Sequence, residues 1–131
     1  MLKNGTLTEA EAIGFIHMKP ETVRIIKERE PGKTDIISQA ETSGKKAAKN
    51  TAMLVPLLPN TYLSSVDVKA YIFPNGIEVK SLITTDDKCG VEVEALTAVC
   101  ATLLTLFEKF KTIDPSLVVS DIKILRRTTI V

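Results

Sequence analysis

The stretch 91-VEVEALTAVCATLLTLFEKF-110 decides the fold of this chain, because it predicts one long helix that is apolar on most of its surface. Its large apolar side chains recur at steps of three and four residues, from Leu96 through Leu103 to Phe110. Small residues such as Ala98 widen that stripe beyond a single face. We therefore expect the rest of the chain to cover this helix on most sides.

The period of the hydrophobic residues and the positions of proline and glycine predict the other elements. They are a strand over 8–18, a helix opened by Pro20 and stopped by Pro31-Gly32, a second helix from Asp35 to Pro56, a hairpin over 62–84 that turns at 74-PNG-76, and a strand over 117–125. This order predicts an α+β, ferredoxin-like fold with a mostly antiparallel sheet covered on one face by helices. Gly44, inside the second helix, marks close packing or a bend. The length of 131 residues fits a single domain over residues 1–131.

Charge and composition exclude several classes of partner. Lys and Arg total 17 against 16 Asp and Glu, so the net charge of +1 gives no reason to expect a nucleic acid or an anionic membrane. No apolar run approaches the ~18 residues of a membrane span, and 1-MLKNGT-6 lacks the apolar core of a signal peptide. We expect a cytoplasmic protein. Cys89 and Cys100 have no His partner nearby in the sequence, so we expect reduced, structural thiols and no metal site.

The charged residues on the predicted helices admit ordinary interpretations. Glu92 and Glu94 stand in a first helical turn, where the helix dipole favours carboxylates by ~0.3–1 kcal/mol. Glu108 and Lys111 have the spacing of a helix-stabilising ion pair. Spacing alone favours these structural interpretations over a functional site.

Several motifs taken together favour a functional site instead. The string 90-GVEVEALTA-98 resembles GVEMEALTA of the MoaC family, the cyclic pyranopterin monophosphate synthases of molybdenum cofactor assembly. Further matches follow in the family's order: 15-FIHMKPET-22 resembles FVTMRSET, 32-GKTDI-36 resembles KGDV, 44-GKKAAKNT-51 resembles AGIQAAKRT, and 54-LVPL-57 resembles LIPL. The resemblance covers nearly the whole chain.

The resemblance implies a lyase that converts cyclised dihydroguanosine triphosphate to cyclic pyranopterin monophosphate and releases diphosphate. Such a site must hold a triphosphate, move protons and stabilise developing charge. The resemblance further implies a homo-oligomer, a hexamer built from dimers with the site at the dimer interface. Surplus apolar surface on the 91–110 helix also favours oligomerisation. No cofactor is implied with certainty, and Mg²⁺ bound with the triphosphate stays open.

Four site residues follow from the helical motifs of the family. Lys111 corresponds to the family's catalytic lysine, and Glu108 stands where the family has an aspartate, so the resemblance implies this catalytic pair. Lys33 and Lys49 correspond to lysines that contact substrate, and we assign them phosphate binding. Lys45 lies one turn before Lys49 and adds local positive potential, although a solvated basic face is the alternative interpretation.

Four more substrate-binding residues come from the ends of other elements. Glu92 and Glu94 correspond to carboxylates implied to recognise the ring or the sugar. Lys19 corresponds to an Arg of FVTMRSET but lacks its planar guanidinium fork. Arg127, with Arg126 beside it, places fixed positive charge near the position where the family's lysine-containing tail begins.

Departures from the family open an alternative. The family's L-C-H-P reads 57-LLPN-60 here, so its histidine is absent; Asn60 can donate hydrogen bonds but cannot shuttle protons. The only histidine, His17, lies on the first predicted strand, where a structural role is the usual one. The family's N-terminal DVS segment and its GGKSG tail also have no counterpart. The alternative is a non-catalytic paralogue that binds a purine triphosphate or a protein partner.

Overall fold

The elements of the computed structural model follow the predicted order along the chain, and the structure describes residues 6–29, 35–87 and 90–130. The strands are β1 (Leu7–His17), β2 (Ser65–Phe73), β3 (Gly76–Thr85) and β4 (Val118–Ile130). The helices are α1 (Pro20–Arg29), α2 (Asp35–Lys49), α3 (Thr51–Leu54) and α4 (Glu92–Phe110). None of the described helices is both long and apolar enough to cross a membrane.

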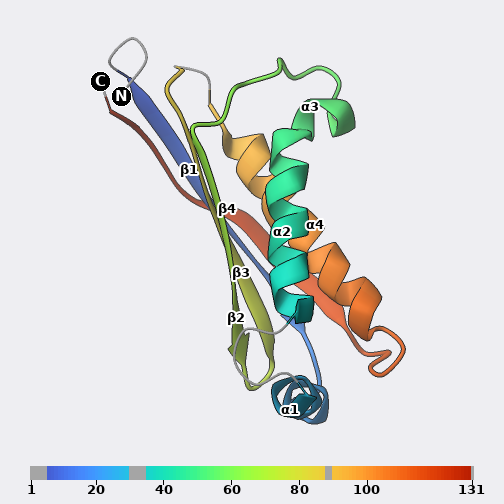
Figure 1. The fold of residues 1–131 in the computed structure, drawn as a ribbon. Helices are drawn as coiled ribbons and strands as arrows, with labels where there is room; N and C mark the ends of the chain where they lie inside the picture. The colour runs from blue at the N-terminus through green and yellow to red at the C-terminus, as the bar shows by residue number, and fades with distance from the viewer. Residues whose placement is uncertain (1–5, 30–34, 88–89, 131) are drawn as a thin grey trace.

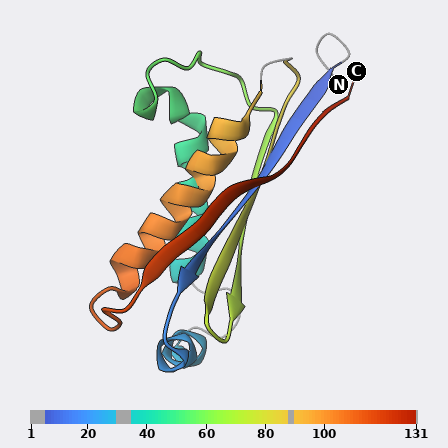
Figure 2. The ribbon, with the colours of Figure 1, turned by 180° about the vertical axis from the view of Figure 1, so that it is seen from behind.

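The strands form one four-stranded sheet in the order β2-β3-β1-β4, with every neighbouring pair antiparallel. Helices α2 and α4 lie side by side on one face of this sheet, and α1 lies at one end of it (Figure 1). The edge strand β4 runs beside α4, as the view from behind shows (Figure 2). This arrangement confirms the predicted α+β, ferredoxin-like fold.

Alternation along the strands explains which sheet face the helices cover. In β1 the buried and half-buried residues alternate throughout, so Ala10, Ala12 and Ile16 point into the core while Glu9 and Glu11 point to the open face. The apolar face then packs against the buried side of α4. Burial of this apolar surface is the main force that joins helices to sheet.

The contact between α2 and α4 depends on Gly44. A Cβ atom at this position would lie 2.7 Å from the carbonyl oxygen of Ala98 and would also collide with Thr102. Thr105 Oγ1 donates to Ser43 Oγ at 3.1 Å on the same seam. The colour gradient in Figure 1 runs in opposite directions along α2 and α4, so the two helices are antiparallel. Of the two roles predicted for Gly44, close packing is confirmed.

The predicted second helix ends earlier than Pro56. Asn50 interrupts it: its side-chain Nδ2 donates to the Lys46 carbonyl at 2.9 Å, and its backbone N–H donates to Ala47 at 3.0 Å. The short helix α3 follows at Thr51. An Asn side chain competes in this way with the helical hydrogen bonds of the backbone.

The last strand is longer than predicted and irregular. β4 continues past residue 125 to Ile130, because Leu7–Glu11 of β1 pairs with residues 126–130. The register shifts between Glu11 and Ala12, where Glu11 pairs with Arg126 but Ala12 pairs with Ile124, so Leu125 is an extra residue in a β-bulge.

Candidate active site

An ion pair joins two predicted site residues at the N-terminal end of α4. Arg127 Nε lies 3.0 Å from Glu92 Oε2, which connects the end of β4 to the first turn of α4. Both side chains are partly exposed, so the pair contributes little to stability. The pair matters for the site because it holds a cation and a carboxylate together at one edge of the helical layer.

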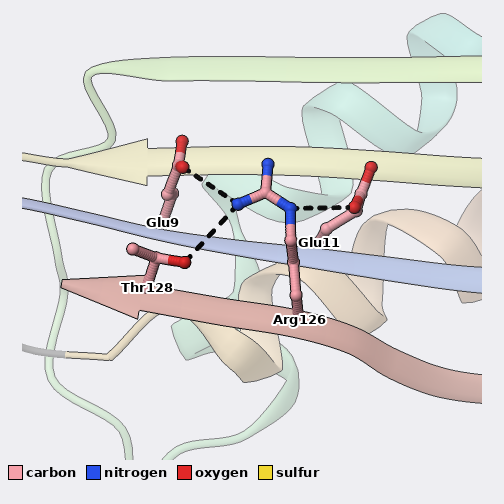
Figure 3. Close-up of polar contacts among 4 residues, drawn as sticks. All are labelled: Glu9, Glu11, Arg126 and Thr128. Carbon is pink, nitrogen blue, oxygen red and sulfur yellow. Dashed lines mark hydrogen bonds and ion pairs between the residues drawn. The ribbon is translucent and has the colours of Figure 1, made fainter.

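The neighbouring Arg126 belongs to the opposite face of the sheet. Its guanidinium group lies between Glu9 Oε1 at 3.1 Å and Glu11 Oε1 at 3.2 Å, with Thr128 Oγ1 at 3.5 Å (Figure 3). The hydrogen bonds from Arg126 to Glu9 and Glu11 hold the pKa of the guanidinium above its ordinary value. Successive residues of a strand point to opposite faces, so Arg127 alone of the two reaches α4.

Glu94 is buried in the first turn of α4, with 7% of its surface exposed. Burial raises the pKa of this carboxyl group, and the nearby Glu92 carboxylate raises it further against the lowering effect of a backbone hydrogen bond. A buried acid that resists ionisation costs stability at neutral pH. Such groups concentrate at sites that exchange protons or bind ligands.

The Glu94→Gln variant tests this cost. Because the folded chain holds the Glu94 proton more tightly than the unfolded chain does, ionisation penalises the native state above the folded pKa. We expect Glu94→Gln to raise the free energy of unfolding at pH 7 by on the order of 1 kcal/mol. The gain should vanish below about pH 4, where both states are protonated. Thermal unfolding across pH measures it.

The matched control is Glu92→Gln, which should give no gain because Glu92 is paired with Arg127. A gain for Glu94→Gln that stayed the same at pH 3.5 and pH 7 would exclude ionisation as its cause.

A cavity of about 520 Å³ lies at the C-terminal end of α2. Lys45 and Lys49 line one side, and residues 61–66, which lead into β2, line the rest. No carboxylate lines this cavity among the described residues, so the two ammonium groups are unopposed within it. The structure thus places Lys49 beside Lys45 in a concave, positively charged site that suits an anionic ligand.

A second hollow, of about 360 Å³, lies on the open face of the sheet. Glu78 and Asp121 line it together with His17 and Lys123. Its carboxylates make it a poorer site for a polyanion than the lysine cavity. His17 Nε2 lies 2.8 Å from Ser120 Oγ, and this bond agrees with a structural role for the histidine.

The predicted catalytic pair lies at the other end of α4. Lys111 Nζ is 2.9 Å from Glu108 Oε1, and both side chains are well exposed. Lys19 belongs to the same end, since its backbone N–H donates to Asp114 Oδ2 at 3.0 Å and the backbone N–H of Asp114 donates to Phe110 at 3.0 Å. Exposure leaves the amine of Lys111 free to reach a ligand or another chain.

Asp114 is a residue whose importance the sequence analysis missed. Its carboxylate accepts hydrogen bonds from the Lys19 backbone, from Thr22 Oγ1 at 2.8 Å and from the Ser116 backbone N–H at 2.9 Å. Burial alone would raise the pKa of this carboxyl group, but these hydrogen bonds and a further one from Ser116 Oγ, which lowers the pKa most, outweigh it and hold the pKa far below the ordinary value. The sequence signal was the Asp-Pro-Ser turn at residues 114–116, which predicts a local Asx turn but not the partner in α1.

The predicted site residues therefore form two groups within one chain. Lys49 lies beyond Gly44 toward the start of α4, so it belongs to the end that carries Glu92. Helix α4 separates that end from Glu108 by about 24 Å, at 1.5 Å per residue. Lys33 lies outside the described residues. One chain alone does not bring the lysine cavity and the Lys111 pair together.

Comparison with known proteins identifies the family. The model of the MoaC family matches residues 1–129 of this chain. The chain belongs to the MoaC family. The cyclic pyranopterin monophosphate synthase of Peptoclostridium acidaminophilum is 35% identical over 126 residues, covering 96% of this chain and 80% of that protein. The synthase of Thermoanaerobacter sp. (strain X514) is 38% identical over 128 residues, covering 96% and 81%.

An archaeal relative extends the range of organisms. The protein named probable cyclic pyranopterin monophosphate synthase from Saccharolobus solfataricus is 38% identical over 130 residues, covering 94% of this chain and 87% of that protein. The predicted MoaC resemblance is confirmed by these matches.

Two departures from the MoaC pattern lie near these groups. Pro59 stands where L-C-H-P has its histidine, in the exposed segment between α3 and β2 that precedes the cavity-lining residues. Glu108 replaces an aspartate and keeps the carboxylate within contact of Lys111. Among the described residues, no three His, Cys, Asp or Glu side chains are grouped closely enough to hold a metal ion. Cys89 lies outside the described residues, while Cys100 is a free thiol whose pKa is raised by burial.

Proposed function

We propose that this chain is a cyclic pyranopterin monophosphate synthase of molybdenum cofactor biosynthesis, acting in the cytoplasm. Its substrate is cyclised dihydroguanosine triphosphate, and its products are cyclic pyranopterin monophosphate and diphosphate. The observation that carries the proposal is the lysine cavity, in which no carboxylate of the described residues opposes Lys45 and Lys49, in a chain of the MoaC family.

The two lysines of the cavity hold the triphosphate. Their ammonium groups neutralise the phosphate oxygens and stabilise the charge that develops as diphosphate leaves. A sugar hydroxyl attacks the α-phosphorus and releases its proton, a new P–O bond forms, and the bond from the α-phosphorus to the bridging oxygen of the β-phosphate breaks with its electron pair on diphosphate. Lys33 lies outside the described residues, and by its position in the family motif we assign it phosphate binding as well.

The remaining charged residues divide recognition and proton transfer. Lys111 exchanges protons with the substrate during ring opening and closure, and Glu108, 2.9 Å away, is its ion-pair partner. Glu92, Glu94 and Arg127 recognise the ring and sugar at the N-terminal end of α4. Lys19 contributes a further cation at the Lys111 end.

Since Lys49 and Lys111 lie at opposite ends of α4, the complete site requires two copies of the chain. One copy supplies the lysine cavity and the other supplies the Glu108–Lys111 pair. We propose a dimer that closes this site and a hexamer built from such dimers. Exposed apolar residues on the outer side of α4, including Leu104 at 62% and Phe107 at 37%, favour association.

The decisive experiment incubates the purified chain with cyclised dihydroguanosine triphosphate and measures diphosphate, with and without added Mg²⁺. We expect release of diphosphate together with the cyclic monophosphate. A second candidate, the non-catalytic paralogue, is favoured by Pro59 at the position of the family's histidine. Binding of the triphosphate without turnover, where a relative such as the Thermoanaerobacter synthase is active, would establish that candidate instead.

A further inference from the structure

We propose that Tyr62 is the stacking wall of the lysine cavity and makes it select a nucleotide over a bare polyphosphate. This inference rests on the proposed function, because it assumes that the cavity binds the substrate. It adds a specificity-determining residue that the family motifs do not contain.

Tyr62 lines the cavity that Lys45 and Lys49 line from the facing helix. Tyr62 is 73% exposed, so most of its surface is open to a ligand. One concave site thus combines an aromatic residue with two lysines, which can offer a π-face and positive charge to the same ligand. These are the two elements that bind a base and its phosphates together.

The backbone around Tyr62 is fixed to the sheet. Thr85 Oγ1 donates to the Tyr62 carbonyl oxygen at 2.8 Å, and the Ser64 backbone N–H donates to the Thr84 carbonyl oxygen at 2.8 Å. Bonds on both sides of Leu63 hold this short segment against β3. The ring is therefore carried by an ordered backbone, which lowers the entropy cost of binding.

The size and chemistry of the cavity match this role. Its volume of about 520 Å³ falls within the range of small-molecule sites, ~300–1,000 Å³. The hydroxyl groups of Thr61, Ser64 and Ser65 add hydrogen-bonding groups to the same wall. A fused purine-type ring system can stack on Tyr62 while its phosphates reach Lys45 and Lys49.

The experiment measures binding of GTP and of inorganic triphosphate to the wild-type chain and to the Tyr62→Leu and Tyr62→Phe variants. We expect Tyr62→Leu to weaken GTP binding about 5–150-fold and inorganic triphosphate binding less than about twofold, since a stacked base contributes ~1–3 kcal/mol. Tyr62→Phe keeps the π-face and should bind GTP within about twofold of the wild type. Calorimetry gives the affinities.

Intrinsic fluorescence gives a direct second readout. The chain has two tyrosines and no tryptophan, so a Tyr71→Phe chain emits only from Tyr62. We expect GTP to quench that emission and inorganic triphosphate to leave it nearly unchanged. A chain with Tyr62→Phe that retains Tyr71, on β2, corrects for light absorbed by GTP.

The outcomes separate this inference from the proposed function. Equal losses of GTP and triphosphate affinity in Tyr62→Leu, or no loss in either, would overturn the stacking role even where the wild-type chain releases diphosphate. Selective loss of GTP affinity in a chain that never turns over its substrate would support Tyr62 and reject catalysis.

Discussion

Mixing Lys49→Ala chains with Lys111→Ala chains restores diphosphate release that each variant lacks alone. Each substitution removes a charged group from the proposed site, and we expect a loss of about a hundredfold or more in kcat. In a mixed dimer, one site receives both wild-type residues and the other receives both alanines. Random mixing of the two variants should therefore recover roughly a quarter of the wild-type rate.

The matched controls are each variant unfolded and refolded alone, which should stay inactive. The mixture must be refolded or expressed together so that chains exchange. If the mixture also stayed inactive although mixed oligomers had formed, the site would not be shared between chains, and the separation of Lys49 from Lys111 along α4 would argue against the proposed reaction.

Replacing Asp114 with alanine lowers the free energy of unfolding at pH 7 by about 3 kcal/mol. The substitution removes the acceptor for the backbone N–H of Lys19, the hydroxyl of Thr22 and the backbone N–H of Ser116. Hydrogen bonds to a charged acceptor contribute ~1.5–3 kcal/mol each, and buried donors left without a partner add a further cost. Denaturant unfolding measures the difference.

The difference in the free energy of unfolding between the wild type and Asp114→Ala decreases as the pH falls. The folded pKa of Asp114 lies below the unfolded value of about 3.9, so the contribution is complete above that pH and is lost as the pH falls. The gap between wild type and Asp114→Ala should narrow below about pH 4. A matched control is Asp67→Ala, which removes an exposed carboxylate 4.0 Å from Lys69 and should cost less than about 0.5 kcal/mol. A gap that was as large at pH 2.5 as at pH 7 would contradict the account based on charge.

Most of the fold could be predicted from the sequence, because the period of the hydrophobic residues and the position of a glycine in a helix both depend directly on packing. The apolar stripe from Leu96 to Phe110 forms α4, and Gly44 lies where that helix meets α2. The break at Asn50 escaped prediction because it depends on one side-chain hydrogen bond that competes with the helix. The length of β4 was not predicted, because pairing with β1 sets that length.

The candidate site was predicted in its residues but not in its arrangement. The motifs indicated Lys49 and Glu92, and Arg127 was predicted from its place near the start of the family's tail. The structure places Lys49 in a cavity and joins Glu92 to Arg127. Spacing along a helix cannot show that Lys111 lies at the other end of the helical layer from that cavity, since this relation depends on the antiparallel packing of α2 on α4. Neither hydrophobic periodicity nor a family motif indicated a role for Tyr62.

The extra residue Leu125 determines which arginine serves the helical layer. A regular ladder continued from Ile124 would pair Ala10 with Arg126, so Arg126 and not Arg127 would point toward Glu92. The bulge reverses the parity of the strand after Ile124, so that Arg127 reaches Glu92 on the helical side and Arg126 reaches Glu9 on the open face. A single irregularity in an edge strand thus sorts two adjacent, chemically identical cations between separate tasks.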